Sequence, residues 1–368
     1  MAYYIFCEVA WMKYYNGVTE NDKPRNGGKF IDENGEGGEV DNFTPYNHKC
    51  YGCVMHYGNE MHLERLDSSK SLRNSPKIED VTVIWVASND SGSRIVGWYE
   101  HATMYRYWQD ICDGEYDYFR NYNFEANEED CYLIDTKDRT FIVPRAPQVG
   151  KGKGMGQSQV WYADSEYAQT VFIPKVQKYL NSVRGKCKPF WFSREALKAT
   201  AKDKGQSTEE LIKRSQELRN QSGTTVVDVL KLLNLAVKKD DCYETRLERG
   251  SYFCCHAYLE EAEEDLKMAL QYEKGIEALS YLMSTERKLG HNYLAIEIGE
   301  KVRSRRKEDK FWSIDAMDLA WLYLGEGELA QAEALMNECE LEQDGAKHKE
   351  WIAELREVLK EEKQSKKQ

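Results

Sequence analysis

A glycine-rich stretch early in the chain carries the side chains best suited to acid–base chemistry. Residues 35–43 read GEGGEVDNF and include Glu36, Glu39, Asp41 and Asn42. A carboxylate can activate water or stabilise positive charge in a transition state, and an amide can bind a departing group. We expect Asp41, Asn42 and Glu39 to be the catalytic residues of an enzyme, although turn residues of these types commonly bond only to their own backbone.

A second stretch, residues 150–164, combines lysines with alternating glycines. It reads GKGKGMGQSQVWYAD, and no acid occurs between Asp138 and Asp164. It contains no Gly-Lys-Ser or Gly-Lys-Thr, the sequence that ends a nucleotide-binding P-loop. Glycine lets backbone N–H groups approach a phosphate closely, which favours contact with phosphate. A surface loop with solvated lysines is an equally good interpretation. The residues expected to contact nucleic acid are Arg145, Lys151, Lys153, Gln157 and Ser158.

Aromatic side chains are frequent in the same half of the chain. Adjacent strand residues point to opposite faces, so one member of each neighbouring aromatic pair should be core while the other lines a second surface. A flat ring beside a basic loop can stack on an unpaired base. The candidates for such a pocket are Trp11, Trp98, Tyr99, Trp161 and Tyr162.

Cysteine and histidine form one cluster that could bind a metal. Within segment 48–56 lie His48, Cys50, Cys53 and His56. A zinc site usually takes its second ligand pair from a distant segment, and no second CxxC is present. We therefore favour buried or surface thiols, and we predict neither a metal nor another cofactor.

Composition restricts the class of protein. The 368 residues suffice for two or three domains. The net charge of -12 argues against broad attraction to nucleic acid but allows a local basic groove. The start of the chain lacks signal-peptide features, no run is long enough to cross a membrane, and ten cysteines are scattered along the chain. These features predict a cytoplasmic protein with no membrane partner.

The hydrophobic pattern changes along the chain. In residues 1–185, short apolar runs between turn residues predict five or six strands, typical of a small, partly open β-barrel. The strands are expected at 2–10, 81–87, 94–99, 132–135, 140–144 and 159–163, with 132–135 and 140–144 forming a hairpin. Residues 186–249 are expected to be a helical linker region after a boundary at 187–194, with capping motifs at Ser207–Glu210 and Thr225–Asp228.

Residues 250–368 repeat a helical pattern. Ala262, Ala295 and Ala332 recur at spacings of 33 and 37 residues. This region resembles tetratricopeptide repeats, whose helix pairs stack because no pair buries its apolar stripe alone. The expected fold class is therefore α+β, a β-barrel domain followed by an all-α repeat region, and such an array more often binds a protein partner than does chemistry.

The first 180 or so residues resemble the PUA-like β-barrel domains, including the EVE and ASCH groups. The matching segments are GEGGEVDNF at 35–43, YGCV at 51–54, IVGWYEHATMYR at 95–106 and FIVPRAPQVGKGKGMGQSQVWYAD at 141–164. The resemblance implies that a modified base is flipped out of DNA into an aromatic pocket, as in prokaryotic restriction and phage-defence proteins. Some phage-defence DNA glycosylases act on hypermodified phage cytosine, and the resemblance extends to them.

Three functions follow from this interpretation. No nuclease motif follows the domain, so the chain either excises the modified base itself as a DNA glycosylase or recruits an effector through its repeats as a non-catalytic reader. A reader of modified RNA is the third, because this barrel class serves both nucleic acids. We expect modified phage DNA as the ligand and base excision as the activity.

Overall fold

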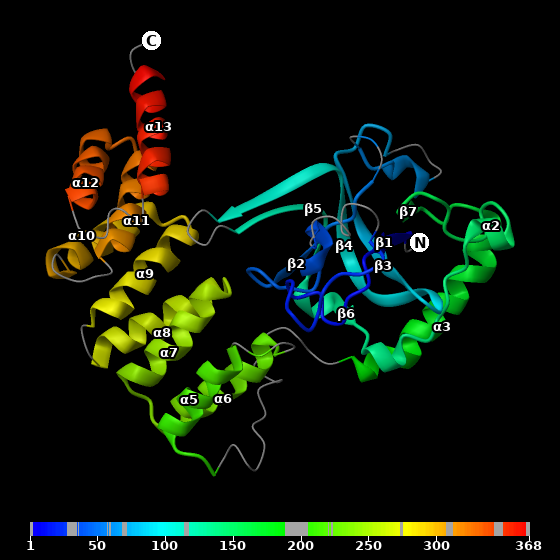
Figure 1. The fold of residues 1–368 in the computed structure, drawn as a ribbon, viewed down its shortest axis with the longest axis horizontal. Helices are drawn as coiled ribbons and strands as arrows, with labels where there is room; N and C mark the ends of the chain where they lie inside the picture. The colour runs from blue at the N-terminus through cyan, green and yellow to red at the C-terminus, as the bar shows by residue number, and fades with distance from the viewer. Residues whose placement is uncertain are drawn as a thin grey trace. The chain divides into compact units, whose positions relative to one another are not determined.

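The chain divides into two compact units. The computed structural model describes residues 3–27, 35, 37–56, 58, 60–67, 72–113, 118–187, 205–219, 221, 224–272, 275–306, 312–341 and 349–365. Unit 1 is Met1–Lys198 with Glu217–Val229, and unit 2 is Ala199–Gln216 with Leu230–Gln368. All the strands lie in unit 1, and most of the helices lie in unit 2 (Figure 1). The predicted order of a sheet-rich part followed by a helical part is confirmed, while residues 188–194 of the expected boundary lie outside the described residues.

Unit 1 is built on one seven-stranded sheet. Its strands are β1 (Tyr3–Val9), β2 (Lys49–Gly52), β3 (Lys77–Asn89), β4 (Gly92–Asp113), β5 (Tyr118–Asn127), β6 (Cys131–Leu133) and β7 (Val160–Trp161). Their order is β2-β5-β4-β3-β1-β7, with β6 also paired to β4. Among these strands, β1 and β3 pair in parallel and the other pairs are antiparallel. Because the edge strands β2 and β7 do not pair over the described residues, the sheet is open rather than closed into a barrel.

Both faces of this sheet are buried. Alternate residues of β1 and β3 feed two hydrophobic clusters, one around Trp85 and Tyr99 and the other around Phe6 and Trp98. Helix α3 (Ile173–Val183) covers the second cluster with the buried residues Ile173, Val176, Leu180 and Val183. Their three- and four-residue spacing is that of an amphipathic helix. The central strands β1 and β3 therefore have core on both sides.

The predicted hairpin of 132–135 with 140–144 is wrong. β6 pairs with Gly97–Tyr99 of β4, and Ile142 forms a bridge with Arg94 of the same strand. A single 3₁₀ turn, Thr136–Asp138, separates the two segments. Both take their hydrogen bonds from a strand more than thirty residues away, which no local turn signal reveals. The pattern also does not predict β5, whose apolar residues are interrupted by asparagine and arginine.

The helical region begins as predicted. Its helices are α5 (Thr208–Arg219), α6 (Val226–Lys239), α7 (Tyr243–Cys255), α8 (Leu259–Tyr272), α9 (Ile276–Lys288), α10 (Asn292–Arg306), α11 (Trp312–Gly325), α12 (Leu329–Leu341) and α13 (Lys349–Ser365). Ser207 and Glu210 exchange side-chain-to-backbone bonds of 2.7 and 3.2 Å at the start of α5. Thr225 and Asp228 do the same at α6, so both capping boxes are confirmed. Over the described residues, none of the helices combines the length and apolar character that crossing a bilayer requires.

Three helix hairpins share one turn geometry. They pair α7 with α8, α9 with α10 and α11 with α12. Each turn has one residue with left-handed backbone: Ala257 (φ 53°), Gly290 (φ 79°) and Gly327 (φ 75°). The next residue donates its N–H to the carbonyl five positions earlier, in the pairs Tyr258–Phe253, His291–Glu286 and Glu328–Tyr323. These turns recur at the predicted spacings of 33 and 37 residues, which confirms a helical repeat.

The first turn has alanine where the other two have glycine, and Ala257→Gly is expected to stabilise the protein. A Cβ in left-handed backbone costs roughly 1–2 kcal/mol. Glycine removes this cost but loses more backbone entropy on folding than alanine, so the net gain in stability should be about 0.5–1 kcal/mol. The thermal midpoint of the helical circular dichroism signal should rise. The matched change Gly290→Ala should lower it, because a Cβ there has free space and only the φ angle opposes it. Shifts of the same sign would contradict this reading of the turns.

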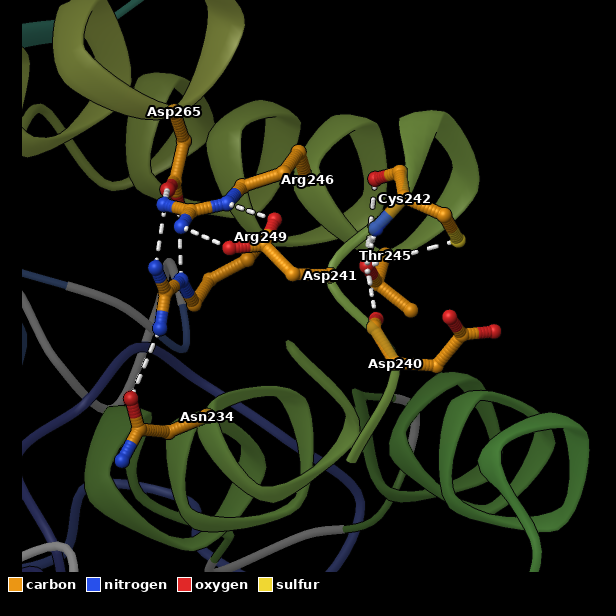
Figure 2. Close-up of polar contacts among 8 residues, drawn as sticks. All are labelled: Asn234, Asp240, Asp241, Cys242, Thr245, Arg246, Arg249 and Asp265. Carbon is orange, nitrogen blue, oxygen red and sulfur yellow. Dashed lines mark hydrogen bonds and ion pairs between the residues drawn. The ribbon is translucent and has the colours of Figure 1, made fainter. Parts of the chain in front are cut away.

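A buried charge network joins α6 to the first hairpin. Asp265 of α8 is 1% exposed and accepts hydrogen bonds from two arginines of α7 (Figure 2). Arg246 Nη1 donates to Asp265 Oδ1 at 2.7 Å, and Arg249 donates through Nε and Nη2 at 2.6 and 2.8 Å. Arg249 Nη1 also donates to Asn234 Oδ1 of α6 at 2.7 Å. Arg246 donates through Nε and Nη2 to the two carboxylate oxygens of Asp241. Two arginines thus balance two aspartates among three helices.

Candidate functional site

Two of the candidate catalytic residues have structural bonds. Asp41 is the last residue of the 3₁₀ helix η1 (Gly38–Asp41), and Asn42 follows it. Asn42 is buried, and its amide clamps the chain after β2: Nδ2 donates to Cys53 O at 3.1 Å and Oδ1 accepts from Cys53 N at 2.9 Å. The Asn42 carbonyl accepts the Tyr99 hydroxyl, and Asp41 Oδ1 accepts from Thr44 Oγ1 at 3.2 Å. Both ends of the Asn42 amide are therefore used by the fold; Glu36 lies outside the described residues.

Glu39 has a different environment. Glu39 is buried, with only 7% of its surface exposed. Burial raises the pKa of Glu39, against hydrogen bonds from the backbone N–H groups of Glu39 and Ala10 that lower it. A carboxyl whose pKa is raised by burial can hold the proton that a general acid delivers. Among the three candidates, Glu39 is the one whose environment suits proton transfer.

Replacing Asn42 by alanine is expected to lower the free energy of unfolding by about 2–3 kcal/mol, because two buried backbone groups of Cys53 lose their partners. Chemical denaturation of the full chain measures this. Asp41→Ala is the matched control and should cost within about 1 kcal/mol, since its bond to Thr44 is partly exposed and water can replace it. Unchanged stability in Asn42→Ala would mean that its amide is available to a ligand.

The five candidate pocket aromatics are divided between the two sides of the sheet. Tyr99 and Tyr162 belong to the cluster around Trp85, and Trp11 packs against it. Trp98 and Trp161 belong to the opposite cluster. Both members of each neighbouring pair are buried, because core covers both faces of the sheet. The structure therefore does not bring the five together as one pocket wall.

The contacts of these rings are within the protein. Trp98 stacks on Tyr132 with ring centroids 4.6 Å apart, and Trp161 packs on Phe6 at 5.0 Å. The Tyr162 hydroxyl accepts from His62 N at 2.8 Å, and Arg65 lies 4.4 Å above its ring. A base that stacked on either tryptophan would have to displace another aromatic side chain.

The loop 150–159 is held by its own backbone. Met155 is fully buried; its N–H donates to Pro144 O at 2.9 Å and its carbonyl accepts from Ala146 N at 2.7 Å. A Cβ on Gly154 would lie 2.2 Å from Pro144 O. Glycine at 154 is therefore required by close packing of two chain segments, not by the approach of a ligand.

The candidate nucleic-acid contacts fall into two groups. Arg145 is engaged: Nη1 donates to Glu8 Oε2 at 2.8 Å, Nη2 to the other carboxylate oxygen, and Nε to Ser93 Oγ at 2.9 Å. An arginine held by a carboxylate in this way is not available to a phosphate in this conformation. The exposed group comprises Lys151, Lys153, Gln157 and Ser158.

Helix α3 adds two lysines that the motif analysis missed. Lys175 and Lys178 are one turn apart and exposed. Lys153 Nζ lies 5.6 Å from the ring centroid of Tyr167, at the start of the helical segment that continues into α3. Lys175 follows about 12 Å further along at about 1.5 Å per residue. The signal in the sequence is the absence of any acid from 167 to 187.

We call Lys151, Lys153, Lys175 and Lys178 the basic strip. The other cations of segment 139–187 are all occupied: Arg139 is buried against backbone carbonyls, Arg145 binds Glu8, Arg184 binds Glu100 and Lys186 binds Asp138. The four lysines of the strip form no ion pair with another described residue. Their charge is available to an anionic ligand.

The histidines and cysteines of segment 48–56 point to different partners. His48 Nδ1 lies 3.0 Å from Glu128 Oε1. Burial, followed by a hydrogen bond with Cys50, raises the pKa of the Cys131 thiol well above its usual value. The His56 ring stacks on Trp108. Across the part of the chain that the structure describes, no three histidine, cysteine or acidic side chains converge as metal ligands would.

Comparison with known proteins identifies no family. No protein-family description matches the chain, and no curated protein matches it. Among solved structures, the crystal structure of a MamA protein matches 44% of this chain and 94% of its own length, with 16% identity and a TM-score of 0.34. A TM-score this low carries no conclusion about fold or function. The helical repeat is shown instead by the three equivalent turns.

Proposed function

We propose that this chain is a nucleic-acid-binding protein that reads a modified base through unit 1 and holds a protein partner through its helical repeats. The observation that carries the proposal is the basic strip, four exposed lysines without carboxylate partners in a protein of net charge -12. Binding of such cations to phosphates releases counterions from the nucleic acid, which drives association. Exposed cations without carboxylate partners can attract a polyanion locally even when the protein is acidic overall.

The modified base is proposed from the resemblance of unit 1 to PUA-like domains. In this scheme the basic strip holds the phosphates, and a flipped base is stacked and hydrogen-bonded by the domain. Hypermodified cytosine in phage DNA is the proposed ligand, which would give the chain a role in antiviral defence. Because the five candidate pocket aromatics are buried on two faces, the flipped base would need another site.

The helical repeats support the partner half of the proposal. Hairpin arrays expose a long surface, and exposed aromatic residues are enriched where proteins bind one another. In this region Tyr293, Trp321 and Trp351 are 78%, 37% and 44% exposed. An effector bound through these repeats would supply the activity that a reader lacks.

Base excision is the second candidate, and Glu39 favours it. A protonated Glu39 would donate a proton to the departing base, while Asp41 would stabilise positive charge on the sugar. Incubation with modified phage DNA followed by alkali tests this activity. Strand breaks that disappear in Glu39→Gln would support excision. Intact strands with retained binding would mean that the chain reads the modified base without excising it.

Binding of wild-type protein to labelled modified DNA, unmodified DNA and RNA at several salt concentrations tests the proposal itself. Affinity for every polyanion should fall with salt, since each phosphate contact contributes a slope of about -0.9 in log K against log salt on duplex DNA. Discrimination between the modified and unmodified base should not depend on salt. Stronger binding to RNA would assign the reader to RNA.

A further inference from the structure

A large bulge interrupts the pairing of β4 with β5. The register runs from the pair Met104–Phe124 directly to the pair Gln109–Tyr122. Residues 105–108 of β4 therefore lie opposite a single residue of β5, Asn123. Bulges bend a strand and redirect its side chains, and they are frequent beside functional sites.

Asn123 has unused hydrogen-bonding capacity. The residue has no exposed surface. Its Oδ1 accepts from Val54 N at 3.5 Å, whereas its Nδ2 has no acceptor within the described structure. The bond from Val54 fixes the orientation of the amide, because that N–H needs an oxygen. A buried donor without an acceptor destabilises a fold and needs an explanation such as a ligand or an ordered water.

The bulge is rigid. Arg106 is 5% exposed and donates to the carbonyls of Met61, Leu72 and Ser75. Gln109 Nε2 donates to the carbonyls of Tyr107 and Trp108 at 3.1 and 3.0 Å. These bonds hold the backbone of the bulge in place, which lowers the entropic cost of binding a ligand there.

Two aromatic residues of the bulge, Tyr107 and Trp108, lie opposite Asn123 in the strand register. Trp108 stacks on His56 with ring centroids 5.2 Å apart and an interplanar angle of 12°. Tyr107 is 53% exposed. Aromatic side chains and an amide donor on facing strands are groups that can recognise a nucleobase, which has both a π-face and hydrogen-bonding edges.

We propose that the β4 bulge is the base-binding site. A planar heteroaromatic ring accepts a hydrogen bond from Asn123 Nδ2 through a carbonyl oxygen or a ring nitrogen and stacks on Tyr107 and Trp108. The ring enters by parting the His56–Trp108 stack, because Asn123 is covered in the free protein. The assignment of this ring to a nucleic acid rests on the proposed function. A free nucleoside and a base in DNA both present the same aromatic face and hydrogen-bond acceptors.

Fluorine NMR of full-length protein labelled with 5-fluorotryptophan tests the site, with the Trp108 resonance assigned by Trp108→Phe. The probes are 5-hydroxymethyl-2′-deoxycytidine and an oligonucleotide that contains it. Each is expected to shift the Trp108 signal saturably. Asn123→Asp keeps the acceptor for Val54 and removes the donor, so it should weaken binding about tenfold or more. Tyr107→Ala, at an exposed position, should weaken it several-fold, and Tyr293→Ala is the matched control.

Each outcome decides between site and function. If the oligonucleotide binds without moving the Trp108 signal, or binds both variants with unchanged affinity, the bulge is not the site although the proposed function stands. If the nucleoside binds at Trp108 and no nucleic acid binds, the site stands and the nucleic-acid function fails. If neither probe moves the signal, the inference is overturned. A poorly folded Asn123→Asp leaves Tyr107→Ala to decide.

Discussion

Replacing Asp265 by alanine is expected to lower the free energy of unfolding of the helical region by about 3–5 kcal/mol, because it removes the buried carboxylate that Arg249 binds and leaves Arg246 with Asp241. The side chains of Arg246 and Arg249 are only 12% and 15% exposed, and both donate to this carboxylate (Figure 2). Without Asp265, water cannot fully solvate either guanidinium. The loss should loosen α7 from α8 and, through Arg249 and Asn234, from α6.

Hydrogen exchange of amides in α7 and α8, with chemical denaturation followed by circular dichroism, measures this effect. Asp241→Ala is the matched control: it removes another carboxylate from Arg246, but the Asp241 side chain is 40% exposed. Water replaces such a partner, so the cost should stay within about 1 kcal/mol. Equal losses in the two variants would contradict the view that burial of Asp265 gives the network its effect.

The second large effect is expected at the basic strip. Alanine at Lys151, Lys153, Lys175 and Lys178 together should lower affinity for DNA of any sequence, on the order of 10³-fold at moderate salt, and reduce the salt slope by about three to four units. Because these side chains are exposed and form no ion pairs with described residues, stability should hardly change. The ratio of affinities for modified and unmodified DNA should be preserved, since phosphate contacts carry no base information.

Fluorescence anisotropy with labelled duplexes measures both affinity and slope. Lys238 and Lys349, exposed lysines of the helical region, provide the control: their double alanine variant also removes positive charge but lies outside the strip. If the logarithm of affinity falls in both variants in proportion to the number of lysines removed, two against four, the effect is one of net charge. If neither changes affinity or slope, the basic strip is not the nucleic-acid contact.

Sequence alone locates the features whose physics is local. The capping boxes at Ser207 and Thr225 depend on side chains three residues apart, and the structure has both. The hairpin repeat depends on a left-handed turn and a buried alanine at fixed offsets. Ala257 is also recognisable as an exception, because the two later turns have glycine at the equivalent positions, Gly290 and Gly327.

Features that depend on distant contacts could not be predicted. Nothing near Arg145 in the sequence indicates that Glu8 holds it. The alternation of Trp98 and Tyr99 indicates opposite faces but not that α3 and its neighbours cover one of them while core covers the other. The β4 bulge arises from the register of two long strands. No sequence motif therefore marks Asn123 or Trp108.

The central claim, that this chain reads a modified base in nucleic acid, is tested most directly by equilibrium competition on the wild-type protein. Duplexes of one sequence, with hydroxymethylated, glucosylated or unmodified cytosine, would compete for a labelled modified duplex across a range of salt concentrations. We predict a preference for a modified duplex that stays constant while all affinities fall with salt. Equal affinity for all three duplexes at every salt concentration, or no binding of any, would contradict the claim.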